Sequence, residues 1–122
     1  VKKGDVLFFY GEIGVGKTTF IRYLINNLQK KNQLKLTEVP SPTFNLLNEY
    51  ELKDLLIQHY DLFRLKNTNE TKNIGLLENC NNVLTLVEWP EKIKKKPKSR
   101  IDLIFEYKSM LGQRILKINE FR

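Results

Sequence analysis

The segment from Gly11 to Thr19, "GEIGVGKTT", combines residue types and a spacing that can bind a phosphate group. Gly11, four further residues and then Gly16, Lys17 and Thr18 match the pattern G-x-x-x-x-G-K-[ST]. Glycines lack a Cβ, so successive backbone N–H groups can turn toward an anion, which a following helix attracts with its positive end. In such a loop the lysine reaches the β- and γ-phosphates and the threonine hydroxyl ligates Mg²⁺. The segment therefore predicts a binding site for a nucleoside triphosphate.

Acidic residues end two apolar segments, "LLIQHYD" at Asp61 and "VLTLVE" at Glu88. A phosphate-binding loop of this kind needs an acid at the end of a neighbouring strand, to hold Mg²⁺ and to place the attacking water. The continuously apolar segment before Glu88 is typical of a central strand, which favours a functional role for Glu88, with Asp61 second. The alternative is that Glu88 only begins a loop and Asp61 caps the segment after it. Thr43, in the proline-framed "VPSPTF", is a candidate contact of the γ-phosphate or metal, or a simple turn residue.

The elements that must position these residues are predicted from local patterns. The apolar run 5–10 predicts a strand covered on both faces, and apolar residues at three- and four-residue spacing predict an amphipathic helix over 17–31. Two prolines exclude a helix in the loop 39–44. Further strands are predicted over 45–52, 55–63 and 83–90, a short helix over 74–78, and a closing hairpin over 100–107 and 113–121. This order predicts an α/β fold with a mixed sheet.

Length and composition indicate one domain covering residues 1–122. The chain is 41% hydrophobic, has no apolar run of about 18 residues and no signal-peptide pattern, so we expect a cytoplasmic protein without membrane contact. The single cysteine, Cys80, cannot form an internal disulfide, and one cysteine with one histidine cannot form a structural zinc site.

His59 shares a strand face with Asp61, and we expect a structural role for it rather than a catalytic one.

The net charge of +7 is concentrated in the segment 91–100, "EKIKKKPKSR". A solvated charged loop is the preferred interpretation of this run, with contact to a polyanion as the alternative. Arg64 is interpreted as a surface ion-pair residue rather than as a charge stabiliser.

The absence of certain motifs limits which nucleotide the chain is expected to bind and which reaction it is expected to catalyse. The chain has neither an N-K-x-D element nor a D-x-x-G switch sequence, so ATP is favoured over GTP. Little chain is available for the lid and acceptor pocket of a small-molecule kinase. The residues leave open an ATPase, a nucleotide-dependent binding or regulatory module without significant hydrolysis, and a small P-loop kinase.

Four segments, "GEIGVGKTTFIR", "SPTFNLLNEYE", "HYDLFRL" and "LVEWPEK", resemble the TsaE (YjeE) family in order and spacing, from Gly4 to about Lys117. The resemblance implies a P-loop NTPase fold with a mixed sheet and a protein that binds and slowly hydrolyses ATP with Mg²⁺. It also implies action with TsaD and TsaB, which transfer a threonylcarbamoyl group to N6 of adenosine 37 in tRNA. The tRNA would then be met only through that complex, which ATP hydrolysis resets between turnovers.

The same resemblance assigns roles to individual residues. The phosphate site would comprise Gly14, Val15, Gly16, Lys17, Thr18 and Thr19. Thr18 and Glu88 would bind Mg²⁺, Asp61 would be the acid needed for activity, Trp89 would lie beside the metal-binding acid, and Thr43 would belong to a switch-like loop. Arg114 resembles a Gly-Arg position near the nucleotide, although "GQR" is one residue longer than the family's "GR".

The sequence also departs from the family pattern. Family members normally carry a strand and a helix before the P-loop strand, and this segment helps to bind adenine, so we expect a sheet that lacks them here. The segment "IGLLENCNN" is less acidic than the family's usual stretch, which leaves an altered partner surface open.

Overall fold

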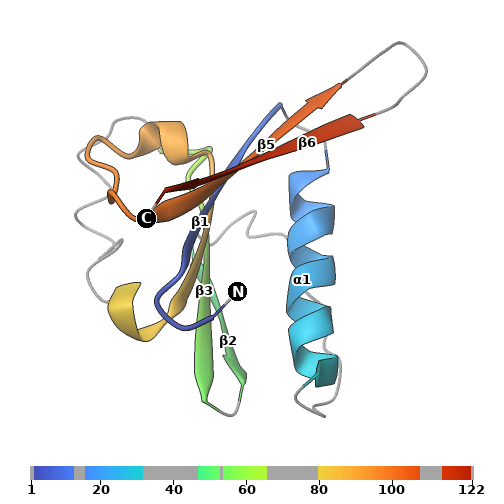
Figure 1. The fold of residues 1–122 in the computed structure, drawn as a ribbon, viewed down its shortest axis with the longest axis vertical. Helices are drawn as coiled ribbons and strands as arrows, with labels where there is room; N and C mark the ends of the chain where they lie inside the picture. The colour runs from blue at the N-terminus through green and yellow to red at the C-terminus, as the bar shows by residue number, and fades with distance from the viewer. Residues whose placement is uncertain are drawn as a thin grey trace.

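The computed structural model contains a six-stranded sheet with one long helix beside it (Figure 1). It describes residues 2–12, 16–31, 47–52, 54–65, 80–107 and 114–121. The elements are β1 (Val6–Tyr10), α1 (Lys17–Lys31), β2 (Leu47–Leu52), β3 (Leu55–Asp61), η1 (Cys80–Asn82), β4 (Leu84–Glu88), η2 (Pro90–Lys92), β5 (Arg100–Tyr107) and β6 (Arg114–Phe121).

The strand order is β2-β3-β4-β1-β5-β6. The inner pairs β3–β4, β4–β1 and β1–β5 are parallel, and the outer pairs β2–β3 and β5–β6 are antiparallel. The two strands in the middle, β4 and β1, are mostly apolar and almost fully buried, because side chains on both of their faces are covered. The predicted mixed sheet is therefore confirmed.

The helix α1 covers one face of the sheet. Ile21 and Ile25 on its inner side are fully buried against Leu7 and Phe9 of β1 and Leu86 of β4. The helix is anchored by this apolar stripe, since an isolated helix of this length is only marginally stable in water. Its first turn is thereby held at the carboxyl ends of the central strands.

The opposite face of the sheet has its own apolar cluster. Phe8, Tyr60 and Val87, which alternate with residues of the first face along their strands, are buried there together with Leu62 and Ile93. Leu62 and Ile93 belong to the segments that follow β3 and β4, so this cluster fixes the chain directly beyond Asp61 and Glu88.

Most local predictions agree with the structure. The helix occupies the predicted residues 17–31, and the strands end within two residues of their predicted bounds. The predicted helix 74–78 and the loop 39–44 lie outside the described residues. Within the described part of the chain, no helix has the length and apolar character needed to cross a membrane.

Removing the apolar contact of α1 should destabilise the protein. We expect Ile25→Ala to lower the free energy of unfolding by about 2–5 kcal/mol, because it deletes a fully buried side chain and leaves a cavity. Tyr23→Ala on the same helix, where the side chain is 70% exposed, should change it by no more than about 0.5 kcal/mol. Urea denaturation measures both, and equal losses would contradict the packing of α1 on the sheet.

Candidate nucleotide-binding site

The two outer glycines of the phosphate-binding pattern have backbone conformations that favour glycine. Gly11 has φ 145° and Gly16 has φ 110°, a region that side chains with a Cβ rarely adopt. Gly11 directly follows β1 and Gly16 directly precedes α1. The glycines at these two positions therefore allow the chain to turn from strand to helix.

Lys17, the first residue of α1, is folded back over this turn. Its side chain is buried, its Nζ donates a hydrogen bond to the carbonyl oxygen of Gly11, and the same Nζ lies 3.8 Å from the centroid of the Trp89 ring. Burial lowers the pKa of Lys17, while the negative charges of Glu88, Glu91 and Asp61 act in the opposite direction. The ammonium group thus feels the charge of three acids, and its direct partners among the described residues are a carbonyl and a ring.

Glu88 connects three elements at the end of β4. The Thr18 hydroxyl, in the first turn of α1, donates a hydrogen bond of 3.0 Å to Oε1 of Glu88. Nε2 of His59, from β3, lies 2.8 Å from the other carboxylate oxygen, Oε2. Both His59 and Glu88 are buried, and each carboxylate oxygen has a donor from a different element.

Asp61 lies beside Glu88 at the same edge of the sheet. The two residues are register partners of β3 and β4, so their backbones are about 5 Å apart. Burial raises the pKa of Asp61, and the charge of Glu88 adds to the rise, whereas the N–H of Phe63, 3.0 Å from Oδ1, opposes it. A raised pKa makes the Asp61 carboxylate a stronger proton acceptor.

Trp89 has a strained backbone. With φ 61° and ψ 51° it adopts the left-handed conformation, and among the described residues it is the one non-glycine residue with positive φ. Its ring contacts both the Lys17 ammonium and the ring of Phe63, whose centroid is 4.9 Å away. Strain of this kind clusters at functional sites, and here the indole lies against the ammonium group of Lys17.

The donor set suits magnesium held jointly with a nucleotide. Across the ranges that the structure describes, no three His, Cys, Asp or Glu residues are grouped so that they would hold a metal ion by themselves. Mg²⁺ instead takes one or two protein oxygens together with phosphates and water. The Thr18 hydroxyl and the Glu88 carboxylate, already 3.0 Å apart, fit that requirement.

Comparison with known proteins agrees with this geometry. The family model described as "Threonylcarbamoyl adenosine biosynthesis protein TsaE" matches residues 1–115. The chain belongs to the TsaE family. A curated relative of Rickettsia felis, named tRNA threonylcarbamoyladenosine biosynthesis protein TsaE, is 42% identical over 94 residues, which cover 77% of this chain and 53% of the relative. The protein of the same name in Bacillus subtilis is 33% identical over 108 residues, which cover 86% of this chain and 63% of that one. The chain therefore spans between about half and two thirds of the length of these TsaE relatives.

A solved structure supports the fold. The crystal structure of YdiB of Bacillus subtilis aligns with a TM-score of 0.70 at 24% identity, covering 100% of this chain and 72% of that one. At this identity the likeness concerns the fold alone. The chain has the α/β fold of P-loop NTPases with a mixed sheet, as the sequence predicted.

The other residues implied by the resemblance to TsaE lie in several parts of the chain. Gly16 adjoins Lys17, and Thr19 is exposed on the first turn of α1. Arg114 is the first residue of the edge strand β6, opposite Tyr107 in register, two strands away from β1. Gly14, Val15 and Thr43 lie outside the described residues. The structure thus brings together Lys17, Thr18, Asp61, Glu88 and Trp89, and the roles of these residues, like those of the others, stay predictions.

The sequence interpretation did not foresee that His59 contacts Glu88. Its face of β3 was assigned correctly, because it lies two residues before Asp61, but its proximity to Glu88 depends on the alignment of β3 with β4. The sequence feature that could have indicated this contact is that the two segments 55–61 and 84–88 both end in an acid, as neighbouring strands at one site would.

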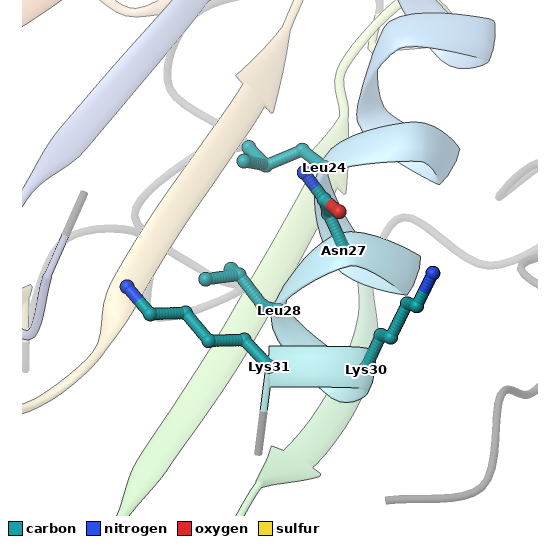
Figure 2. Close-up of a pocket in the computed structure, with 5 residues that line it drawn as sticks. All are labelled: Leu24, Asn27, Leu28, Lys30 and Lys31. Atoms are coloured by element: carbon teal, nitrogen blue, oxygen red, sulfur yellow. The ribbon is translucent and has the colours of Figure 1, made fainter. Parts of the chain in front are cut away.

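A separate hollow of 510 Å³ lies at the other half of α1, lined by Leu24, Asn27, Leu28, Lys30 and Lys31 (Figure 2). Its described lining contains no acid and none of the residues around Glu88. The hollow is therefore separate from the candidate site at the ends of β3 and β4.

The raised pKa of Asp61 has a consequence for stability. A carboxyl whose pKa is higher in the folded than in the unfolded protein favours folding while it is protonated, and this contribution is lost as the pH rises through the folded value. Asp61→Asn removes the charge and keeps an acceptor for the Phe63 N–H. We expect Asp61→Asn to be more stable than wild type near neutral pH, and the difference to shrink as the pH falls toward the ordinary value of 3.8.

Urea denaturation across this pH range, without nucleotide or metal, measures the difference. Asp54→Asn, in the exposed turn between β2 and β3, is the matched control for the chemical change. A variant at Asp61 that is less stable than wild type at neutral pH would contradict an unfavourably buried charge.

Proposed function

We propose that this chain is an ATP-binding and ATP-hydrolysing subunit required for threonylcarbamoylation of N6 of adenosine 37 in tRNA, acting with the TsaD–TsaB complex. The observation that carries the proposal is the hydrogen bond between Thr18 and Glu88 beside Lys17, at the carboxyl edge of a TsaE-family sheet. The names of the curated TsaE relatives support the pathway, and the residues at the sheet edge support the chemistry.

Lys17 is suited to bind the β- and γ-phosphates. Its present partners are a backbone carbonyl and an aromatic ring, both of which attract an ammonium group less strongly than phosphate oxygens do. Because Lys17 and the N-terminus of α1 coincide, one anion can be attracted by both. Binding would exchange weak partners of Lys17 for strong ones.

Thr18 and Glu88 would hold Mg²⁺ together with the nucleotide. Once bound there, the ion would neutralise charge on the phosphate oxygens. Glu88 supplies a carboxylate that is already buried and oriented, so its reorganisation on binding is small.

Asp61 is the candidate proton acceptor for hydrolysis. A water oxygen attacks the γ-phosphorus, the bond from that phosphorus to the β–γ bridging oxygen breaks, and ADP leaves with the electron pair. The proton of the attacking water passes to a carboxylate oxygen of Asp61. Burial raises the pKa of this carboxyl and so favours the transfer.

The interaction with TsaD and TsaB rests on membership of the family. The tRNA would be approached through that complex, and the reaction of this chain would be the hydrolysis that drives the complex through its cycle. Exposed lysines at positions 94, 95 and 98 follow η2, close in sequence to Trp89, on a surface open to a partner.

Substitution at the phosphate site should abolish hydrolysis. We expect Lys17→Ala and Glu88→Ala each to lower the rate of phosphate release from Mg-ATP by about 100-fold or more, since the first removes a cation that contacts the phosphates and the second removes a ligand of the Mg²⁺ that neutralises them. The assay compares Mg-ATP with Mg-GTP, for the protein alone and with TsaD–TsaB. The rate with ATP should exceed that with GTP and should rise with the partners.

Lys31→Ala is the matched control, because it removes an exposed lysine at the far end of the same helix and should leave hydrolysis unchanged. Full activity in both site variants would overturn the assigned site. Nucleotide binding without phosphate release, with or without partners, would identify a nucleotide-dependent binding module instead of an ATPase.

A further inference from the structure

We propose that His59 is a positioning residue for Glu88: its hydrogen bond selects the carboxylate oxygen that faces Thr18 and the incoming Mg²⁺–nucleotide. This inference rests on the proposed function, since it concerns the metal-binding acid of the same site. It assigns to the single histidine a role in orienting a ligand, not in touching the nucleotide.

The two carboxylate oxygens of Glu88 have different hydrogen-bond partners. Oε2 lies 2.8 Å from Nε2 of His59, and Oε1 lies 3.0 Å from the hydroxyl of Thr18. A carboxylate has no hydrogen to donate, so Nε2 of His59 is the donor. With Oε2 held by β3, rotation of the carboxylate is restricted and Oε1 is left facing the first turn of α1.

The hydrogen bond between His59 and Glu88 is buried, so its loss would leave the carboxylate without a replacement donor. The side chain of His59 is 0% exposed and that of Glu88 is 3% exposed, so water cannot replace a lost donor at Oε2. A buried carboxylate needs hydrogen-bond donors, and a bond to an ionised acceptor is stronger in such surroundings than in water. Without His59, Glu88 would have to turn both oxygens toward the phosphate side to find partners.

The other ring nitrogen indicates that the imidazole serves Glu88 in particular. Nδ1 of His59 is buried and has no hydrogen-bond partner among the described residues. A residue needed only to fill this place in the sheet would be better as an apolar side chain, because an unpaired buried nitrogen carries a cost. The hydrogen bond to Glu88 offsets that cost. Side chains that hydrogen-bond to metal ligands commonly serve to orient them.

The test separates orientation of Glu88 from stability of the sheet. His59→Gln places an amide N–H approximately where Nε2 lies, and His59→Phe fills the space without a donor. Ile57→Ala is the matched control, since Ile57 lies two residues earlier on the same face of β3 and is equally buried. Calorimetry measures the affinity for the non-hydrolysable analogue AMP-PNP in EDTA and at increasing Mg²⁺, and thermal unfolding of each variant is recorded in parallel.

We expect His59→Phe to bind AMP-PNP in EDTA as wild type does but to need about 10-fold more Mg²⁺, the usual effect of losing a second-layer partner. His59→Gln should restore the wild-type Mg²⁺ requirement. Ile57→Ala should unfold at a lower temperature with no change in that requirement. If His59→Phe does not fold, His59→Asn replaces it, because its shorter amide cannot reach Glu88 while the amide of Gln can.

Equal Mg²⁺ requirements for wild type and for the variant without a donor would overturn the positioning role while leaving the proposed function intact. The same holds if Ile57→Ala raises the requirement as much as the variant at His59. A wild-type protein whose affinity for AMP-PNP does not depend on Mg²⁺ would overturn the proposed metal site and this inference with it.

Discussion

A carboxylate buried at the end of a central strand must receive hydrogen bonds, and Glu88 receives them from the helix on one side and the neighbouring strand on the other. This requirement ties α1, β3 and β4 to a single point. Thr18 can reach Glu88 only if α1 begins directly above the carboxyl end of β4, and the apolar contacts of Ile21 and Ile25 with the sheet hold the helix there. The contacts that pack α1 on the sheet therefore also set the position of Thr18 relative to Glu88.

The charged groups around Glu88 are held in an environment that disfavours their ionised forms. Burial raises the pKa of Asp61 and lowers that of Lys17, two opposite shifts with one cause. Within the described part of the chain, neither group has a strong ion-pair partner in direct contact. Burying these two groups thus costs free energy of folding, and such costs are common at functional sites.

Three of the described residues with positive φ lie at the same edge of the sheet. Gly11 follows β1, Gly16 precedes α1 and Trp89 follows β4, whereas Gly4, which also has positive φ, precedes β1. Glycine adopts this conformation at little steric cost, but Trp89 does so against the preference of its side chain. Contacts of the indole with Lys17 and Phe63 hold it there.

Local patterns in the sequence determined the helix 17–31 and the strands, and they predicted the phosphate-binding loop, because periodicity and glycine spacing depend on residues close along the chain. They also placed Asp61 and Glu88 at strand ends and His59 on the face of Asp61. Strand order and register were decided only by the tertiary structure, since they depend on packing between segments far apart in sequence. That register brought His59 to Glu88 across 29 positions and Thr18 to Glu88 across 70. The left-handed conformation of Trp89 and the burial that shifts Asp61 and Lys17 have the same origin: they arise from contacts that form only when the sheet and the helix are assembled.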